Sequence, residues 1–211
     1  MMATQDSEAD LLLERAGGGD VAAREKLLVH YQERLLQMVR LRMDRRLAAR
    51  VDPSDIVQET LIEAVQKLSD YLRRRPLPFY PWLRQLAFER LVDLHRRHVR
   101  AQKRSVRREE RQSPPLPNSS AQELADRLVA QGSTPSARLK RLELRTRVKL
   151  ALSQLSELDR EVLVMKHLEQ LSTPEIAAIL KITEGAFYTR HVRALERLRN
   201  LLHDTFGKVE P

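Results

Sequence analysis

The chain has 211 residues, a formal net charge of +9, no cysteine, and 32% charged against 4% aromatic residues. The absence of thiols excludes a disulfide framework and a thiolate metal site, and no run of about 18 apolar residues is present that could span a membrane. This composition favours several short amphipathic helices, a cytoplasmic location without membrane insertion, and a polyanionic partner such as nucleic acid.

The first strongly periodic segment follows three glycines and Asp20. Leu27, Tyr31, Leu35 and Met38 recur there at steps of three and four residues, which places them on one face of a helix. The Asp20 side chain is suited to cap the free amides at the start of this helix. We therefore expect a helix that begins next to Asp20 and buries this face.

A second helix is expected to begin at Asp52. Asp52 can cap it, Pro53 suits its first position, and Asp55 complements the positive end of its dipole. Its predicted buried stripe consists of Val57, Leu61, Ala64, Val65, Leu68 and Leu72. Its predicted exposed acidic and amide side chains are Asp55, Gln58, Glu59 and Glu63. A docking surface and an ordinary solvated helix face explain these exposed side chains equally well on spacing alone.

A third helix is expected from about Pro81, after a proline-rich bend. Between residues 84 and 111 the sequence holds ten Lys or Arg against four Asp or Glu. Aromatic side chains beside basic ones are typical of surfaces that bind single-stranded nucleic acid. We expect Trp82 and Phe88 in the core and Tyr80 in a loop that is open to a nucleotide. The candidate DNA-contacting residues of this region are Tyr80, Arg84, Arg90, Arg96, Arg97 and Arg100.

A segment rich in proline, serine and asparagine follows, without an apolar period, and it predicts a linker. Within this linker, the spacing of Leu124, Leu128 and Val129 is suited to one or two helical turns. The predicted boundaries are 1–104 for a first domain, 105–137 for the linker, 138–205 for a second domain and 206–211 for a tail.

The second domain contains a helix-turn-helix pattern. Ser172 and Glu175 form a capping box at the start of a short helix, and Thr183 can cap a last helix over about residues 184–202. His191 lies on the apolar face of that helix and is expected to be a packing residue. The face that could enter a DNA major groove carries Ala186, Thr189, Arg190, Arg193 and Arg197. On this face we expect Arg190 to read a base and Arg197 to hold a phosphate, although a plain amphipathic hairpin shares the same pattern.

Three segments, taken in order, resemble one protein family. They are "VDPSDIVQETLIEAV", "PFYPWLRQLAFERLVDLHRR" and "ALSQLSELDREVLVMKHLEQLSTPEIAAILKITEGAFYTRHVRALERLR". Their order and spacing are similar to those of extracytoplasmic-function sigma factors of bacterial RNA polymerase, in the sigma-70 superfamily, over most of residues 10–204. The resemblance implies an all-α fold of two small helical domains, a region 2-like bundle and a region 4-like helix-turn-helix domain, joined by a flexible linker.

The resemblance also implies roles for the candidate residues. Asp55, Gln58 and Glu59 would face the clamp helices of core RNA polymerase, and the flap of its large subunits would be a second contact. The basic helix would read the -10 element and help to melt it, so that promoter DNA is a partner in double- and single-stranded form. The last helix would read the -35 element, with Tyr188 standing where Lys is usual. The family pattern also admits an anti-sigma factor as a partner.

The sequence shows no catalytic constellation, so we expect a sigma factor that directs promoter-specific initiation without catalysing a reaction itself. No cofactor is expected, and no metal at Asp52, Asp55 and Glu59, because no His joins these carboxylates. Ser54 replaces a commonly acidic residue beside them, and Glu89 on the basic helix would repel phosphate. Two rival functions stay open: a stand-alone helix-turn-helix transcriptional regulator, and a metal-dependent nucleic-acid enzyme.

Overall fold

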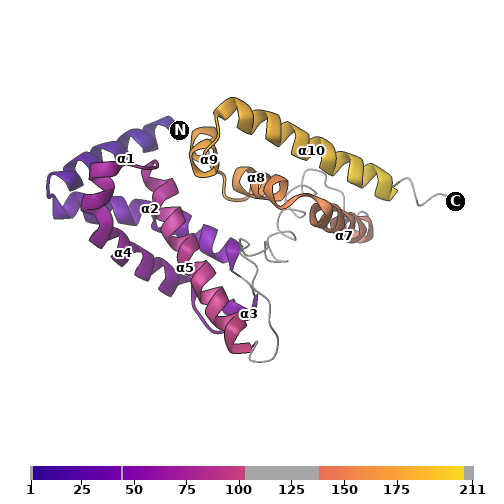
Figure 1. Cartoon of the computed structure of the whole chain (residues 1–211), viewed down its shortest axis with the longest axis horizontal. Helices are drawn as coiled ribbons and strands as arrows, with labels where there is room; N and C mark the ends of the chain where they lie inside the picture. Colours follow the sequence, from indigo (N-terminus) through magenta and orange to yellow (C-terminus); the bar gives the residue numbers. More distant parts are fainter. Residues whose placement is uncertain (1, 44, 103–137, 207–211) are drawn as a thin grey trace. The chain divides into compact units, whose positions relative to one another are not determined.

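The computed structural model of the chain describes residues 2–43, 45–102 and 138–206, and these residues form helices without a strand (Figure 1). The helices are α1 (Met2–Gly17), α2 (Val21–Arg42), α3 (Arg45–Ala48), α4 (Pro53–Arg74), α5 (Phe79–Gln102), α7 (Arg138–Gln154), α8 (Glu157–His167), α9 (Thr173–Leu180) and α10 (Glu184–Phe206). They belong to two compact units, α1 to α5 and α7 to α10, which divide between residues 109 and 110. The predicted all-α fold is confirmed.

The predicted linker over residues 105–137 lies outside the described residues, and so do the helical turns predicted at Leu124, Leu128 and Val129. The division between the two units lies within that predicted linker. The domain boundaries stay predictions.

Two aspartates start the long helices of the first unit, as predicted. The Asp20 carboxylate accepts a hydrogen bond from the Ala23 amide at 2.9 Å and binds the Arg15 guanidinium at 2.6 Å. The Asp52 carboxylate accepts hydrogen bonds from the amide and the hydroxyl of Ser54, at 2.8 and 2.7 Å. The Ala23 amide bond, followed by the Arg15 bond, lowers the pKa of Asp20, and the Ser54 hydroxyl and amide lower the pKa of Asp52. Both carboxylates therefore cap as anions.

The core of the first unit lies where α2, α4 and α5 contact one another. The face of α2 predicted to be buried is buried at Leu27, Tyr31, Leu35 and Met38. Of the stripe predicted on α4, Val57, Ala64 and Leu68 are buried, and Leu61, Val65 and Leu72 are half-buried. Three further residues of α4 that the prediction left out are also buried: Ile56, Thr60 and Tyr71. Thr60 reaches the core because its hydroxyl donates to the Ile56 carbonyl at 2.7 Å, which satisfies it inside the helix.

Five aromatic rings pack together in this core: Tyr31, Tyr71, Phe79, Tyr80 and Trp82. Tyr71 stacks on Trp82 with ring centroids 4.4 Å apart, and Tyr31 stacks on Tyr80 at 5.6 Å. The Tyr71 hydroxyl donates to a backbone carbonyl in the loop before α5, at 3.1 Å, and burial raises its pKa to about 12. The cluster joins α2, α4 and the start of α5 into one bundle.

The second unit is built on α10, which packs on α7, α8 and α9. The Ser172 hydroxyl and the Glu175 side chain form the predicted capping box of α9, in which the Ser172 amide donates to the Glu175 carboxylate at 2.8 Å. The helix ends at Lys181, whose φ of 55° is left-handed, and Thr183 accepts a hydrogen bond from the Ala186 amide at 3.2 Å. The helix-turn-helix pattern is therefore confirmed as α9, a tight turn and α10.

Candidate docking and nucleic-acid surfaces

The predicted docking residues lie on the exposed face of α4. Asp55, Gln58 and Glu59 are exposed, and Ile62 continues the same face with 60% of its surface exposed. We call these four residues the α4 docking face. The sequence analysis missed Ile62, although its spacing of seven residues from Asp55 and four from Gln58 places it on this face. An exposed apolar side chain among polar ones offers area that a protein partner can bury.

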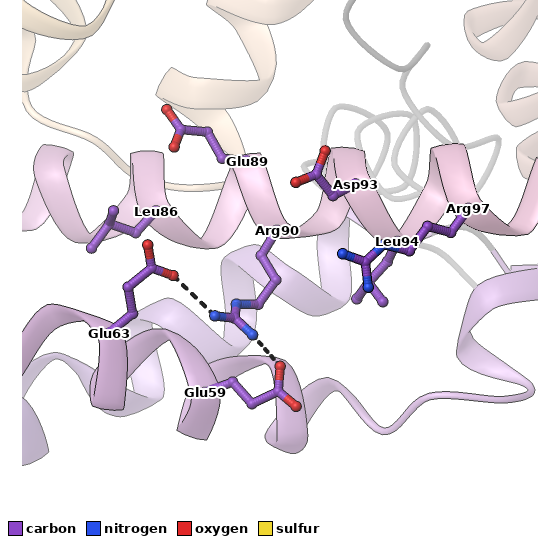
Figure 2. Close-up of a pocket in the computed structure, with 8 residues that line it drawn as sticks. All are labelled: Glu59, Glu63, Leu86, Glu89, Arg90, Asp93, Leu94 and Arg97. Carbon is purple, nitrogen blue, oxygen red and sulfur yellow. Dashed lines mark hydrogen bonds and ion pairs between the residues drawn. The ribbon is translucent and has the colours of Figure 1, made fainter.

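A guanidinium from α5 reaches this face. Arg90 Nη1 donates to Glu59 Oε2, and Arg90 Nη2 donates to Glu63 Oε2 at 2.9 Å (Figure 2). Lys67 Nζ also binds Glu63, at 2.6 Å. Both terminal nitrogens of its guanidinium hold carboxylates, so the structure lends no support to the predicted contact between Arg90 and DNA, which stays a prediction. The structure thus joins a residue predicted to dock on protein with one predicted to bind DNA.

Arg90 lies in a shallow pocket of about 230 Å³ between α4 and α5. The lining residues are Glu59, Glu63, Leu86, Glu89, Arg90, Asp93, Leu94 and Arg97. Burial alone would lower the pKa of Arg90, but hydrogen bonds to Glu63 and Glu59 outweigh burial and raise it. The Lys67 bond, and then the Arg90 bond, lower the pKa of Glu63. Both groups therefore stay charged near neutral pH, so this pair is an ion-pair network and not an acid-base site.

The prediction that Tyr80 lies in an open loop is wrong. Because α5 begins at Phe79, before the predicted start near Pro81, Tyr80 lies in its first turn and is 2% exposed. Its ring stacks on Tyr31, the Arg34 guanidinium lies 3.7 Å from the ring centroid, and its hydroxyl donates to the Arg34 carbonyl at 3.3 Å. The ring is therefore a core residue and is not open to stack on a base.

The remaining candidates on α5 divide along the helix. Arg84 is 4% exposed, so the structure lends no support to its predicted contact with DNA. Its guanidinium lies 5.8 Å from the centroid of Phe88, which is half-buried, whereas Trp82 is buried as predicted. Arg96 and Arg97 are exposed. The side chain of Arg100 lies outside the described residues, although its backbone belongs to α5.

The helix-turn-helix presents one side of α10 to solvent. Of the six candidates there, Ala186, Tyr188, Thr189, Arg193 and Arg197 are exposed, and Arg190 is half-buried. Val192, which the sequence analysis missed, is 50% exposed beside them. Below this surface Phe187 is fully buried and anchors the first turns of α10. Contact between this side and DNA stays a prediction.

One of these candidates has a different partner from the predicted one. Arg197 Nη1 binds Oδ2 of Asp159, a residue of α8 that is 1% exposed. Asp159 Oδ1 accepts no hydrogen bond from any described residue. The ion pair with Arg197 is therefore the main interaction that offsets the burial of the Asp159 carboxylate. Contact between Arg197 and a phosphate stays a prediction, since 57% of its side chain is exposed despite this ion pair. Its guanidinium joins α10 to α8, because a carboxylate taken out of water needs a paired cation.

Two histidines also join α8 to α10. His167 Nε2 and His191 Nε2 lie 3.0 Å apart, and the His191 ring stacks on Phe187 at 5.6 Å. Burial, and next the charge of Lys166, lowers the pKa of His167. Burial, and next the charge of His167, lowers the pKa of His191. Half-buried and stacked, His191 is the packing residue that the sequence predicted.

Among the side chains that the structure describes, no three His, Asp or Glu gather so that they could hold a metal ion. Asp52 caps α4 and Glu59 binds Arg90, so neither converges with Asp55 on a common point. Nor do the described residues include a helix that is long and apolar enough to cross a membrane.

Comparison with known proteins identifies the family of the chain. A family model described as sigma-70, region 4, matches residues 145–198, which include the helix-turn-helix. Over 206 residues the chain is 30% identical to the ECF RNA polymerase sigma-E factors of Salmonella typhimurium and Escherichia coli, covering 95% of this chain and 94% of each relative. It is 27% identical to the RNA polymerase sigma-H factor of Pseudomonas aeruginosa, covering 95% of this chain and 96% of that relative. The solved structure of CnrH in complex with the cytosolic domain of CnrY shares the fold, with a TM-score of 0.52 and 24% identity over 93% of this chain and 98% of that one. Because the sigma-E similarity extends along nearly the whole of both chains, this chain belongs to the extracytoplasmic-function family of RNA polymerase sigma factors.

Proposed function

We propose that the chain binds core RNA polymerase and directs it to promoters that contain a -35 and a -10 element. The relatives that align with it along 94 to 96% of their length are named sigma factors of RNA polymerase, which supports the identity of this partner. In this proposal the polymerase supplies the chemistry of transcription. The chain supplies docking, through the α4 docking face, and recognition of DNA.

The observation that carries the proposal is the exposed side of α10. Tyr188, Thr189 and Arg193 lie exposed on this side, while Phe187 is fully buried on the other. A helix that follows a tight turn, fixed by one side and open on the other, fits the major groove of B-DNA. There Arg193 can bind a guanine edge or a phosphate, and Thr189 can contact a base edge. Arg190, half-buried beside them, stays our candidate for a base contact in the -35 element.

Contact with the -10 region is assigned to the C-terminal half of α5. Arg96 and Arg97 are exposed there, beyond the ion pairs of Arg90, and Arg100 follows on the same helix. Cations spaced along one helix can follow a phosphate backbone. Tyr80 and Arg84 are not part of this proposal, because the core already surrounds them.

We further propose an anti-sigma factor as a regulatory partner. CnrH, which shares the fold of this chain, is bound in its solved structure by the cytosolic domain of CnrY. That complex supports a protein partner other than polymerase. A stand-alone regulator is not favoured, because the sigma-E relatives align with 95% of this chain and so include its first unit.

The test of DNA recognition is reconstitution with bacterial core polymerase on a library of promoter fragments. Arg193→Ala is expected to lower promoter-specific transcription by on the order of tenfold, since one good base contact is worth about 1–3 kcal/mol. Arg199→Ala removes the same charge from another exposed position of α10 and is the matched control. Promoter binding by the chain alone, as a homodimer without polymerase, would contradict the proposal.

The test of docking uses a charge reversal away from the ion pairs of Arg90. Asp55→Lys is expected to weaken binding to core polymerase by on the order of tenfold, because Asp55 is exposed on the α4 docking face. Glu25→Lys makes the same charge change at an exposed position of α2 and should leave the affinity unchanged. Equal effects of the two variants would argue for a general charge effect and against a docking face on α4.

A further inference from the structure

The two carboxylates that bind Arg90 differ in exposure and in their number of cationic partners. Glu63 is 26% exposed in its side chain and has two cationic partners, Arg90 and Lys67. Glu59 is 60% exposed in its side chain, and Arg90 is its partner. Glu63 therefore fixes the guanidinium against α4, and the second nitrogen of the same guanidinium fixes Glu59.

This arrangement leaves Glu59 accessible. One carboxylate oxygen, Oε2, accepts the bond from Arg90, whereas Oε1 accepts no hydrogen bond from any residue that the structure describes. An exposed glutamate without a partner samples many rotamers, and ordering it on binding costs conformational entropy. A planar guanidinium held by two carboxylates limits that freedom before a partner arrives.

We propose that Arg90 is a positioning residue for polymerase docking: it holds Glu59 in one orientation on the α4 docking face, with Oε1 directed at the partner. The inference rests on the proposed docking through α4. Arg90 thus contributes to docking from α5 without contacting the polymerase itself. Glu59 and Glu63 neutralise the charge of Arg90. In this proposal Arg90 therefore does not repel a partner that binds the carboxylates of the docking face.

The experiment is a double-mutant cycle on the full chain, with the affinity for bacterial core RNA polymerase as the measurement. Arg90→Gln is expected to weaken binding by on the order of three- to tenfold, and Glu59→Gln by a similar factor. In the double variant the two losses should not multiply, because Arg90 acts through Glu59. Arg90→Lys should recover part of the loss, since an ammonium can hold one carboxylate but not both in a fork. Lys67→Gln removes the other cation bound to Glu63 and is the matched control, which should bind core as the unchanged chain does.

The outcomes separate this proposal from its alternatives. Tighter binding by Arg90→Gln would mean that the ion pair masks Glu59, and multiplied losses would mean that Arg90 acts through the fold alone; either result overturns the proposal. Unchanged core affinity with weaker promoter binding would return Arg90 to the DNA surface and overturn it too. If Asp55→Lys and Glu59→Gln leave core affinity unchanged, docking through α4 itself is wrong, and the role of Arg90 falls with it. If Arg90→Gln unfolds the first unit, the cycle can be repeated with Arg90→Lys, which keeps a cation in the pocket between α4 and α5. That cycle then decides whether Arg90 acts through Glu59.

Discussion

The two helices that carry candidate DNA contacts, α5 in the first unit and α10 in the second, differ in the burial of their first residues. The first six residues of α5, from Phe79 to Arg84, are all buried, and they include two candidate DNA contacts, Tyr80 and Arg84. Of the first six residues of α10, Phe187 alone is buried, and the candidates Ala186, Tyr188 and Thr189 are exposed. The candidate DNA contacts at the start of the helix are therefore core in the first unit and surface in the second.

The difference lies in the neighbouring helices. The start of α5 lies against α4 and against α2, whose Tyr31 and Arg34 both contact the Tyr80 ring. The start of α10 follows a tight turn and is held mainly by Phe187. A cation or a ring is available to a ligand where no neighbouring helix has already paired it.

Replacing a buried aromatic ring in the first unit should cost far more than replacing an exposed one in the second. Tyr80→Ala is expected to lower the free energy of unfolding by about 3–5 kcal/mol, because it opens a cavity in the aromatic cluster. Tyr188→Ala should change it by less than about 0.5 kcal/mol. Urea unfolding can be followed by the fluorescence of Trp82, the single tryptophan, which reports on the first unit, with circular dichroism for both. Similar losses for the two variants would refute the contrast.

Within α10, the two arginines of the exposed side should differ in what they support. Arg197→Ala leaves Asp159 buried without its cation and is expected to cost about 2 kcal/mol of stability in the second unit, less than a fully buried pair because Arg197 is 57% exposed in its side chain. Arg193→Ala should leave stability unchanged and weaken DNA binding. Thermal unfolding by circular dichroism checks the first effect. Adding Asp159→Asn to Arg197→Ala should recover part of the loss, and no recovery would mean that Asp159 is not the cause.

Local signals in the sequence predicted the starts of the helices. Asp20, Asp52 and Ser172 each cap the helix that follows within three residues, so their spacing alone reveals them. The α2 face and the helix-turn-helix follow from periodicity over one or two turns. These parts of the fold depend on interactions between residues that are close in the sequence, so the sequence alone can predict them.

Pairing between distant residues decided the rest of the candidate surfaces. Arg90 and Glu59 are 31 residues apart, Arg197 and Asp159 are 38 apart, and Tyr80 and Arg34 are 46 apart. No spacing rule predicts such contacts, because they depend on which faces of two helices meet. The sequence therefore predicted the basic charge of α5 and α10 correctly but not which of those cations serve the fold.

Both units end a helix on a residue other than glycine in the left-handed region, and here they should behave alike. Arg75 after α4 has a φ of 38°, and Lys181 after α9 has a φ of 55°. Glycine adopts this conformation without steric cost, so Lys181→Gly is expected to stabilise the second unit by about 0.5–1 kcal/mol, and Arg75→Gly the first by a similar amount. Thermal unfolding of each variant measures the gain. Lys181→Ala is the control, since it shortens the side chain without relieving the backbone, and an equal gain from it would contradict the explanation.

The smallest expected effect is a difference in pH dependence between the two units. Burial lowers the pKa values of His167 and His191 from the ordinary value of 6.5, so the folded second unit binds fewer protons than its unfolded chain as the pH falls below that value. Its stability should therefore be complete above about pH 7 and should decline through roughly pH 6 to 5.

The geometry of the His167–His191 pair predicts the same direction of the pH dependence. With both rings neutral, one Nε2 can donate to the other across 3.0 Å, whereas two protonated rings would set two N–H groups against each other. In the first unit the lowered pKa values belong to the carboxyls of Asp20, Asp52 and Glu63, whose ordinary values are 3.8 for Asp and 4.5 for Glu. Its corresponding loss of stability should therefore begin only in more acidic solution. Circular dichroism melts between about pH 5 and 7, with Trp82 fluorescence reporting on the first unit, can separate the two. The double variant His167→Gln with His191→Phe, which keeps a ring on Phe187, should remove the slope of the second unit. A slope that persists in this variant, or stability that rises as the pH falls, would show that the histidine pair is not its source.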